Sequence, residues 1–297
     1  MNEFLQQLIN GLSLGSIYAL IALGYTMVYG VLRFINFAHS DIFMVGSFAG
    51  FYLSRYFPKE SILGGLVILA GSMAICAVLG VVIERLAYRP LREHSKLNVL
   101  ITAIGVSLLL ENSGQFAFGP APKAFPALFP VKSWTFMGGL VLSTNQLAVL
   151  FVTAVLLIAM RFIVLKTRIG TAMRALSFNP LAASLVGINN DVVISFTFAL
   201  GSALAAAGGI LYSMNYQAID PLMGILPGLK AFVAAVLGGI GNIPGAALGG
   251  LLLGVVEVFV NGSRFSTYTD AIAFTILIAI LLFRPAGLLG KPQVEKV

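Results

Sequence analysis

The sequence predicts an all-α, polytopic helical membrane protein with about eight or nine transmembrane helices, some of them broken or re-entrant. Of the 297 residues, 59% are hydrophobic and only 10% are charged, which is too little charge to cover a soluble domain of this length. Several apolar runs approach or exceed the roughly 20 residues that a helix needs to cross a bilayer. Strands of a membrane barrel would give shorter, alternating segments of about 10 residues.

The apolar runs predict a single transmembrane domain over residues 1–297. The N-terminal run lacks a basic start and a cleavage motif, so we interpret it as an uncleaved first span. Three runs are short or interrupted, which is typical of broken or re-entrant helices that line a cavity or are buried in protein; these are 41–57, 97–117 and 223–240. The full set of candidate spans is 5–31, 41–57, 61–86, 97–117, 145–165, 191–213, 223–240, 244–261 and 267–283.

Basic residues gather in the connections on one side of these spans. The positive-inside rule assigns that side to the cytoplasm, so we expect the N-terminus outside and the C-terminus inside. The net charge of +7 is explained by these flanking residues and does not indicate nucleic-acid binding. The clusters are Arg85, Arg89, Arg92 and Lys96 after the third span, Lys166, Arg168 and Arg174 after the fifth, and Arg284, Lys291 and Lys296 in the tail.

The longest outer connection covers residues 118–144. It begins with a stretch rich in Pro and Phe, FGPAPKAFPALFP, and continues as SWTFMGGLVLST. Two short runs of strand-forming residues around Met137-Gly138-Gly139 predict a β-hairpin. Such an element suits a lid over the outer mouth, a landing surface for an outside partner, or both.

Residues 166–190 form the most polar and interrupted connection. Asn179 followed by Pro180 suits a helix N-cap and first helical position, and Gly187 suits the position after that helix. Thr171 is a candidate cap for an earlier short helix, and Asp191 begins the next span, where negative charge is favoured. The pattern predicts an amphipathic helical element. It suits an interfacial helix on the lipid headgroups or a docking helix for a cytoplasmic partner.

Charged side chains inside spans are costly and often functional. Glu111, Lys230 and Glu257 lie well inside candidate spans, and Lys230 and Glu257 are candidates for a pair across neighbouring helices. Buried carboxylates also suit a proton relay in a secondary transporter, so this alternative stays open. Glu84 adjoins Arg85 near a cytoplasmic end, which predicts an interfacial ion pair.

A polar cluster, RFINFAHSD, separates the first two spans. Ser40 or Asp41 would satisfy free N–H groups as a cap of the second span. The alternative is that this break lies near a translocation path. His39 has no second histidine nearby, so we expect a hydrogen-bonded structural role and no metal site. The candidate pathway residues are Asn36, His39, Asp41, Glu111, Lys230 and Glu257.

The sequence offers no convincing enzyme site. It lacks a G-x-x-x-x-G-K-[ST] phosphate loop, so ATP that drives transport would bind to another chain. The stretch GGIGNIPG has Pro244 at the last glycine position of a dinucleotide motif and suits a turn between two helices. The one cysteine, Cys76, excludes an intrachain disulfide and is expected to pack in its apolar run. We expect a transport protein that binds no cofactor itself.

Three stretches carry a family resemblance. They are Tyr18–Phe48, which contains NFAHSD, the connection at 166–190, and Gly228–Glu257, which contains GGIGNIPGA. Over nearly its whole length the chain resembles the permease subunit of branched-chain amino acid ABC importers, of the LivH type. The resemblance implies a bacterial inner-membrane importer of Leu, Ile or Val. A permease for urea or short amides and a stand-alone secondary amino acid transporter remain alternatives.

The resemblance also implies a set of partners. These are a second, related permease, two cytoplasmic ABC ATPase subunits that bind ATP and Mg²⁺, and a periplasmic substrate-binding protein. In such importers the connection at 166–190 is the coupling segment that sits in a cleft of an ATPase. Arg174 is the expected charged contact. The expected coupling residues are Met173, Arg174, Leu176, Phe178, Asn179, Leu181 and Leu185.

Overall fold

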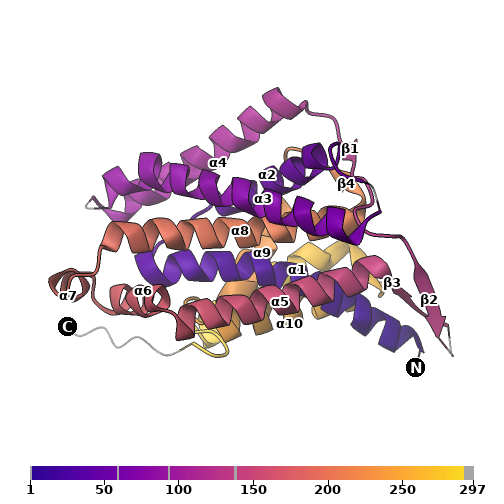
Figure 1. Ribbon diagram of the computed structural model, residues 1–297. Helices are drawn as coiled ribbons and strands as arrows, with labels where there is room; N and C mark the ends of the chain where they lie inside the picture. Colours follow the sequence, from indigo (N-terminus) through magenta and orange to yellow (C-terminus); the bar gives the residue numbers. More distant parts are fainter. Residues whose placement is uncertain (1, 59, 93, 137–138, 291–297) are drawn as a thin grey trace.

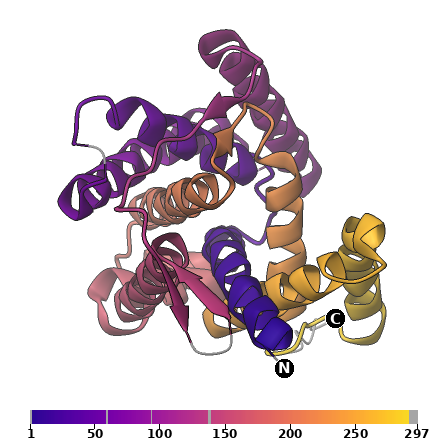
Figure 2. The same ribbon diagram turned by 90° about the vertical axis from the view of Figure 1, so that its right-hand side faces the viewer.

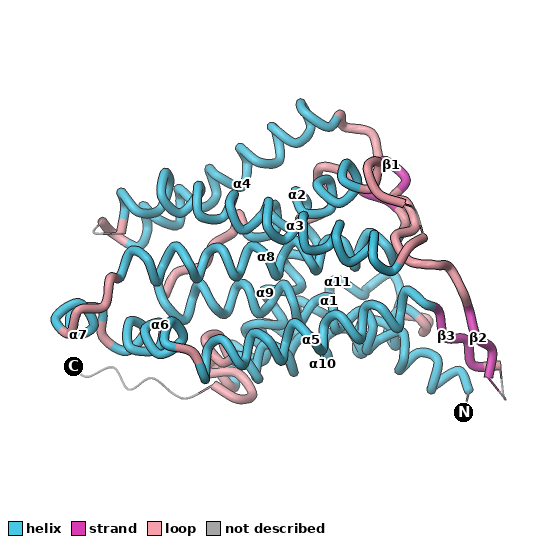
Figure 3. Tube along the Cα trace, in the orientation of Figure 1, coloured by secondary structure: helices cyan, strands magenta, loops and turns pink. Residues whose placement is uncertain are grey.

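The computed structural model describes residues 2–58, 60–92, 94–136 and 139–290. Long helices run side by side between the two ends of the molecule, and the strands lie at one end only (Figure 1; Figure 3). Among the described residues, seven helices are long and apolar enough to cross a membrane, as an integral membrane protein requires. They are α1 (Asn2–Leu32), α3 (Ile62–Ile83), α4 (Lys96–Phe118), α5 (Thr144–Lys166), α8 (Asn190–Tyr216), α10 (Ile243–Asn261) and α11 (Thr269–Phe283). The 3₁₀ turn η3 (Ser266–Tyr268) directly precedes α11 and lengthens this helical segment to 18 residues.

Two further helices are too short to cross a bilayer unaided. α2 (His39–Leu53) has 15 residues and α9 (Ile225–Gly238) has 14. Each follows a largely non-helical stretch, 33–38 before α2 and 217–224 before α9. Of the three runs that the sequence marks as short or interrupted, 41–57 and 223–240 form these short helices. The third, 97–117, forms α4, a continuous helix of 23 residues.

One end of the molecule carries the short helices α6 (Arg168–Phe178) and α7 (Pro180–Leu185), and we call it the basic end (Figure 1). The connection between α3 and α4 lies there too, as a π-helical turn, η1 (Glu84–Tyr88), and a 3₁₀ turn, η2 (Arg89–Leu91). The expected gathering of basic connections at one end is therefore observed, although Lys291 and Lys296 lie outside the described residues.

The opposite end, the hairpin end, carries the N-terminus of α1 and the predicted hairpin of β2 (Ser133–Phe136) and β3 (Leu140–Ser143) (Figure 1). Met137 and Gly138 of the predicted turn lie outside the described residues. A second small sheet pairs β1 (Lys123–Ala124) with β4 (Ala218–Ile219). This pairing ties the outer connection to the non-helical stretch before α9.

Helix α1 is the centre of the bundle, because 94% of its most apolar 18-residue stretch is buried inside the protein. Small residues let α10 approach it closely. A Cβ atom on Gly254 would run into the backbone of Gly15, and one on Gly250 would run into Ala19. Because lipid gives apolar helices no hydrophobic reason to associate, such close packing is a main source of attraction between them. Helices α4 and α11 are much more exposed: only 17% and 6% of the corresponding apolar stretches are buried.

Candidate coupling and translocation sites

The two short helices at the basic end are fixed by local caps. Asn179 accepts a hydrogen bond of 3.0 Å from the N–H of Ala182, and Gly187 follows α7 with a φ of 87°, as the sequence predicts. The predicted cap at Thr171 is wrong. The hydroxyl of Thr167 caps α6 by accepting from the N–H of Gly170 at 3.2 Å, because α6 begins earlier than its apolar pattern suggests.

The candidate coupling residues divide into two groups. Met173 and Leu176 are buried against the bundle, with exposed fractions of 3% and 2%. They anchor α6 and do not present a surface to a partner, so the expectation that they are contact residues is corrected. The exposed apolar side chains, here called the α6–α7 surface, are Phe178 at 87%, Leu181 at 71%, Leu185 at 79% and Val186 at 77%.

Arg174 extends from the same pair of helices. Its side chain is exposed, and its guanidinium donates a hydrogen bond to the hydroxyl of Thr171 at 3.2 Å. The cation therefore stands beside the α6–α7 surface and is available to a carboxylate of another chain. The geometry suits the predicted role of Arg174 as a charged contact.

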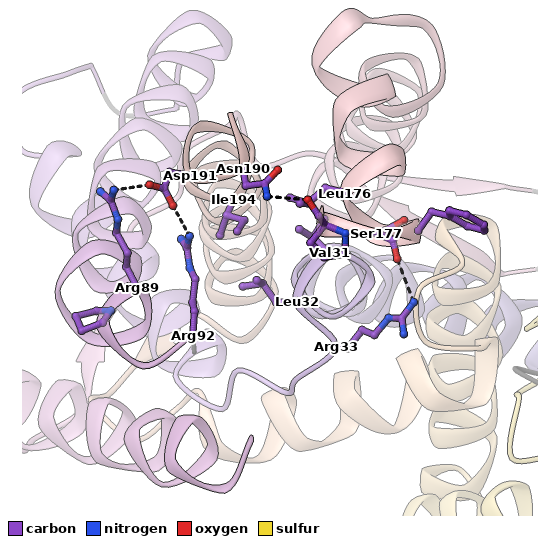
Figure 4. A pocket seen from close by; sticks show the side chains of 13 residues that line it. Val31, Leu32, Arg33, Arg89, Arg92, Leu176, Ser177, Asn190, Asp191 and Ile194 are labelled. Atoms are coloured by element: carbon purple, nitrogen blue, oxygen red, sulfur yellow. Dashed lines mark hydrogen bonds and ion pairs between the residues drawn. The ribbon is translucent and has the colours of Figure 1, made fainter. Parts of the chain in front are cut away.

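A cavity of about 670 Å³ lies between α6–α7 and the bundle (Figure 4). Its walls come from the end of α1, the turn η2, the start of α8 and the junction of α6 with α7. Arg33 and Asn190 both line the cavity. Arg33 donates a hydrogen bond to the carbonyl of Ser177 at 3.2 Å, and Asn190 donates one to the carbonyl of Pro180 at 3.0 Å. The stretch before α2 and the start of α8 are thus bonded to α6 and α7, respectively.

An ionic cluster borders the same cavity (Figure 4). Asp191, in the first turn of α8, pairs with Arg89 and lies 2.7 Å from Arg92. Arg92 also pairs with Glu84, which is fully buried and accepts from the hydroxyl of Ser195 at 2.6 Å. Burial lowers the pKa of the Arg92 guanidinium, and the nearby Asp191 carboxylate opposes that shift.

The partner of Glu84 differs from the sequence prediction. Arg85, its neighbour in sequence, does not hold it, and Arg92 does. Residues eight apart in an α-helix are separated by about 12 Å, which explains why this pair is not apparent from the sequence. The π-helical and 3₁₀ turns of η1 and η2 replace the α-helix here and bring Arg92 back to Glu84.

The π-helical turn also reaches the stretch before α2. Tyr88 donates a hydrogen bond of 2.5 Å to the side-chain oxygen of Asn36, and both residues are buried. The sequence offers no signal for Tyr88, because its distance from Asn36 along the chain carries no helical periodicity. Asn36, one of the candidate pathway residues, is therefore hydrogen-bonded to the turn that ends α3.

Helices α2 and α9 meet at their N-termini inside the bundle. Cβ atoms on Gly224 and Gly228 would both collide with Ser40. His39 packs against Gly24 of α1, next to Gly201 in the middle of α8. The expectation that Ser40 or Asp41 caps α2 is wrong, since the cap position is Ala38 and no side chain bonds the free N–H groups.

Asp41 forms a hydrogen bond with a neighbouring span, α4. It is 1% exposed and accepts a hydrogen bond of 2.6 Å from Ser107, which lies halfway along α4. Glu111 is half-buried and follows Ser107 by four residues, so it lies on the same face of α4. Two carboxylates therefore share the region where α2 begins.

The predicted pair of Lys230 and Glu257 is confirmed. The ammonium of Lys230 on α9 lies 2.7 Å from Glu257 on α10. The network is larger than the sequence indicates, because Lys230 also lies 2.7 Å from Asp270 of α11 and Tyr18 donates to Glu257 at 2.9 Å. The position of Asp270 in the first turn of the last span is the one sequence signal for this partner. The network thus joins four helices, α1, α9, α10 and α11.

Sequence comparison places this architecture in a known family. Residues 7–281 match the family described as "Branched-chain amino acid transport system / permease component". The chain is 46% identical to the high-affinity branched-chain amino acid transport system permease protein BraD of Pseudomonas aeruginosa, over 99% of this chain and 98% of that protein.

Two LivH proteins are also similar. The high-affinity permease protein LivH of Escherichia coli K12 is 43% identical over 99% of this chain and 98% of its own length. The probable branched-chain amino acid transport permease protein LivH of Methanocaldococcus jannaschii is 30% identical over 93% of this chain and 89% of its own. With seven helices in the described part of the chain that could span a membrane, and with these matches, the chain belongs to the family of permease components of branched-chain amino acid transport systems.

Proposed function

We propose that this chain is the permease subunit of an ATP-driven importer for branched-chain aliphatic amino acids in a bacterial inner membrane. The names of its relatives favour this substrate class over urea or short amides, and favour a transport system over a secondary transporter acting alone. The observation that carries the ATP-driven mechanism is the exposed α6–α7 surface. Large apolar side chains gathered on a water-facing helix pair favour contact with another protein.

The partner at that surface is an ATPase subunit. Arg174 would pair with an acidic residue of the ATPase, while the α6–α7 surface enters its cleft as a helix enters an apolar groove. Each ATPase would bind ATP and Mg²⁺ at its own site, since this sequence has no phosphate loop. The permease would then perform no covalent chemistry. The basic end would face the cytoplasm and the N-terminus the periplasm, as the positive-inside rule expects.

The translocation path would run beside the junction of α2 and α9. Lipid does not tolerate open backbone, so interrupted helices belong next to protein or a water-filled cavity. Leu222, just before α9, and Leu226 and Leu229 in its first turns are nevertheless exposed. A second, related permease would cover this face, and the path would lie between the two chains. The residues proposed to line or position it are Asn36, His39, Asp41, Glu111, Lys230 and Glu257.

The hairpin end would receive the periplasmic binding protein. The outer connection is coupled to the path there, because β1 pairs with β4 directly before α9. The side-chain amide of Gln6 in α1 accepts a hydrogen bond from the N–H of Val141 at 2.8 Å and donates one to its carbonyl at 3.0 Å. A binding protein that docks on the hairpin would therefore contact a surface attached to both α1 and α9.

In the proposed cycle, closure of the two ATPases moves α6 and α7. Two contacts connect that movement to the spans, Arg33 with Ser177 and Asn190 with Pro180. Next to Asn190, the pairs of Asp191 with Arg89 and Arg92 link the start of α8 to the turn that follows α3. The interrupted crossings then rearrange around the path and expose it to the other side. No tight substrate site is needed in the permease, because the binding protein selects the amino acid.

Co-purification tests the ATPase contact. The native complex is purified in mild detergent with a tag on this chain, as wild type, Leu181→Asp and the matched control Leu181→Met. We expect an ATPase subunit with the wild type and the Met variant, and its loss with the Asp variant while the permease still elutes as a folded protein. Retention of the ATPase by Leu181→Asp, or its absence from every sample, would overturn the proposal.

A further inference from the structure

A second surface of the chain has the properties of a ligand site, and it lies at the hairpin end, away from the α6–α7 surface. A groove of about 380 Å³ runs between the hairpin-end halves of α3 and α5. The segment 129–134 of the outer connection crosses it. Its volume falls within the range of about 300–1,000 Å³ that is usual for small-molecule sites.

The groove is apolar, and its inner wall is rigid. Phe129 is 7% exposed and packs against Gly65, where a Cβ atom would overlap the phenyl ring. The outer walls are open: Ile62 of α3 is 65% exposed and Phe151 of α5 is 69% exposed. Because both helices are candidate membrane spans, these side chains face the hydrocarbon of the outer leaflet in the proposed orientation.

Polar and amphipathic groups mark only the rim of the groove. Trp134 lines it and is 44% exposed, as expected for an indole at the membrane–water interface. Lys132 also lines it, and its backbone is fixed by three hydrogen bonds with Thr144 at 2.9, 3.0 and 3.1 Å. Among the described residues, no carboxylate forms an ion pair with the Lys132 ammonium.

We propose that this groove binds a phospholipid of the outer leaflet. One acyl chain lies along the apolar walls, and the headgroup phosphate pairs with Lys132 beside the indole of Trp134. The cation at the rim and the hydrocarbon-facing walls fit the two ends of this ligand. The helices α3 and α5 that line the groove lie on the opposite side of the bundle from α9 (Figure 2), so a second permease on the α9 face leaves the groove open to lipid.

The chain contains a single tryptophan, so its fluorescence reports on this groove alone. Full-length protein is reconstituted into phosphatidylcholine vesicles with increasing mole fractions of phosphatidylglycerol brominated on its acyl chains. Bromine quenches an indole only at close range. We expect the quenching of Trp134 to saturate at a low mole fraction of the brominated lipid. Unselective contact with bulk lipid would instead give quenching that rises in proportion to the mole fraction.

Two variants and one control separate a site from bulk contact. Ala148→Phe fills the groove without adding a tryptophan and should abolish the saturating phase. Lys132→Glu should raise the half-maximal mole fraction by about fivefold or more, since one basic residue at an anionic surface contributes that factor. The control Arg264→Glu, an exposed charge at the same end of the molecule, should leave the curve unchanged.

Two results would overturn the proposal. The first is quenching that rises in proportion to mole fraction in the wild type and equally in Ala148→Phe, which would make the groove an ordinary contact with bulk lipid. The second is no quenching at any mole fraction, which would place Trp134 outside the bilayer and make the groove a docking surface for a soluble protein. Melting temperatures confirm that each variant is folded.

Discussion

The hydroxyl of Tyr88 and the side-chain oxygen of Asn36 are joined by a buried hydrogen bond of 2.5 Å. The bond connects the π-helical end of the third span to the stretch that interrupts the second crossing. π-Helical turns often occur at functional sites, because they break the regular helix and allow its register to change. This contact therefore links the basic end directly to the stretch before α2.

Replacing Tyr88 with Phe removes that hydrogen bond and leaves the oxygen of Asn36 unsatisfied. The cost is about 1–3 kcal/mol of stability, which a folded bundle tolerates. We expect amino acid uptake per ATP hydrolysed to fall severalfold, while ATP hydrolysis by the complex continues. The measurement is uptake and hydrolysis in the same proteoliposomes. Tyr268→Phe, at an exposed tyrosine, is the control and should keep the wild-type ratio.

Removing Lys230 leaves Glu257 buried with only the hydroxyl of Tyr18 as a described partner. Breaking a buried pair in this way costs about 3–5 kcal/mol. We expect Lys230→Met to lower the melting temperature of the purified chain strongly, and the double variant Lys230→Met/Glu257→Gln to recover most of the loss. If the double variant is as unstable as the single one, the two groups do not act as a pair.

The ionic cluster at the basic end predicts two different costs for losing an acid. Glu84 is fully buried, so Glu84→Gln should cost about 3–5 kcal/mol. The side chain of Asp191 is 43% exposed, so Asp191→Asn should cost at most about 1 kcal/mol. Thermal unfolding of both variants in one detergent provides the comparison. Equal losses would mean that burial does not set the strength of this cluster.

Close packing between α1 and α10 makes a glycine there sensitive to one extra carbon. Gly254→Ala would push a methyl group into the backbone of Gly15 and should cost about 1–3 kcal/mol. Gly105 in α4 is the matched control, since a Cβ atom there meets nothing within 4 Å. Gly105→Ala should leave the purified chain unchanged or slightly more stable. If Gly254→Ala leaves the stability unchanged, the contact between α1 and α10 can adjust to the extra methyl group.

The sequence predicts the elements whose signals are local. The apolar runs locate the spans, Asn179 and Gly187 delimit α7, and the interruptions before α2 and α9 are visible as breaks in hydrophobicity. The pair of Lys230 and Glu257 follows from the rule that charges inside spans need partners.

Other contacts depend on tertiary structure and leave no local signal. Glu84 meets Arg92 only because π-helical and 3₁₀ turns replace an α-helix between them. Asp41 looks like a helix cap in sequence, yet it bonds Ser107 of α4, a partner that only the packing of the spans brings near. Met173 and Leu176 resemble the exposed apolar residues of α7 in type, and only the docking of α6 determines that they are buried.

Transport by the reconstituted complex tests the central claim most directly. Proteoliposomes containing this permease and the subunits that copurify with it receive the binding protein and labelled leucine on one face and ATP on the other. We predict leucine uptake that requires ATP, persists when the proton gradient is collapsed, and is lost in Leu181→Asp. Uptake by this chain alone, driven by a proton gradient without ATP, would contradict the account.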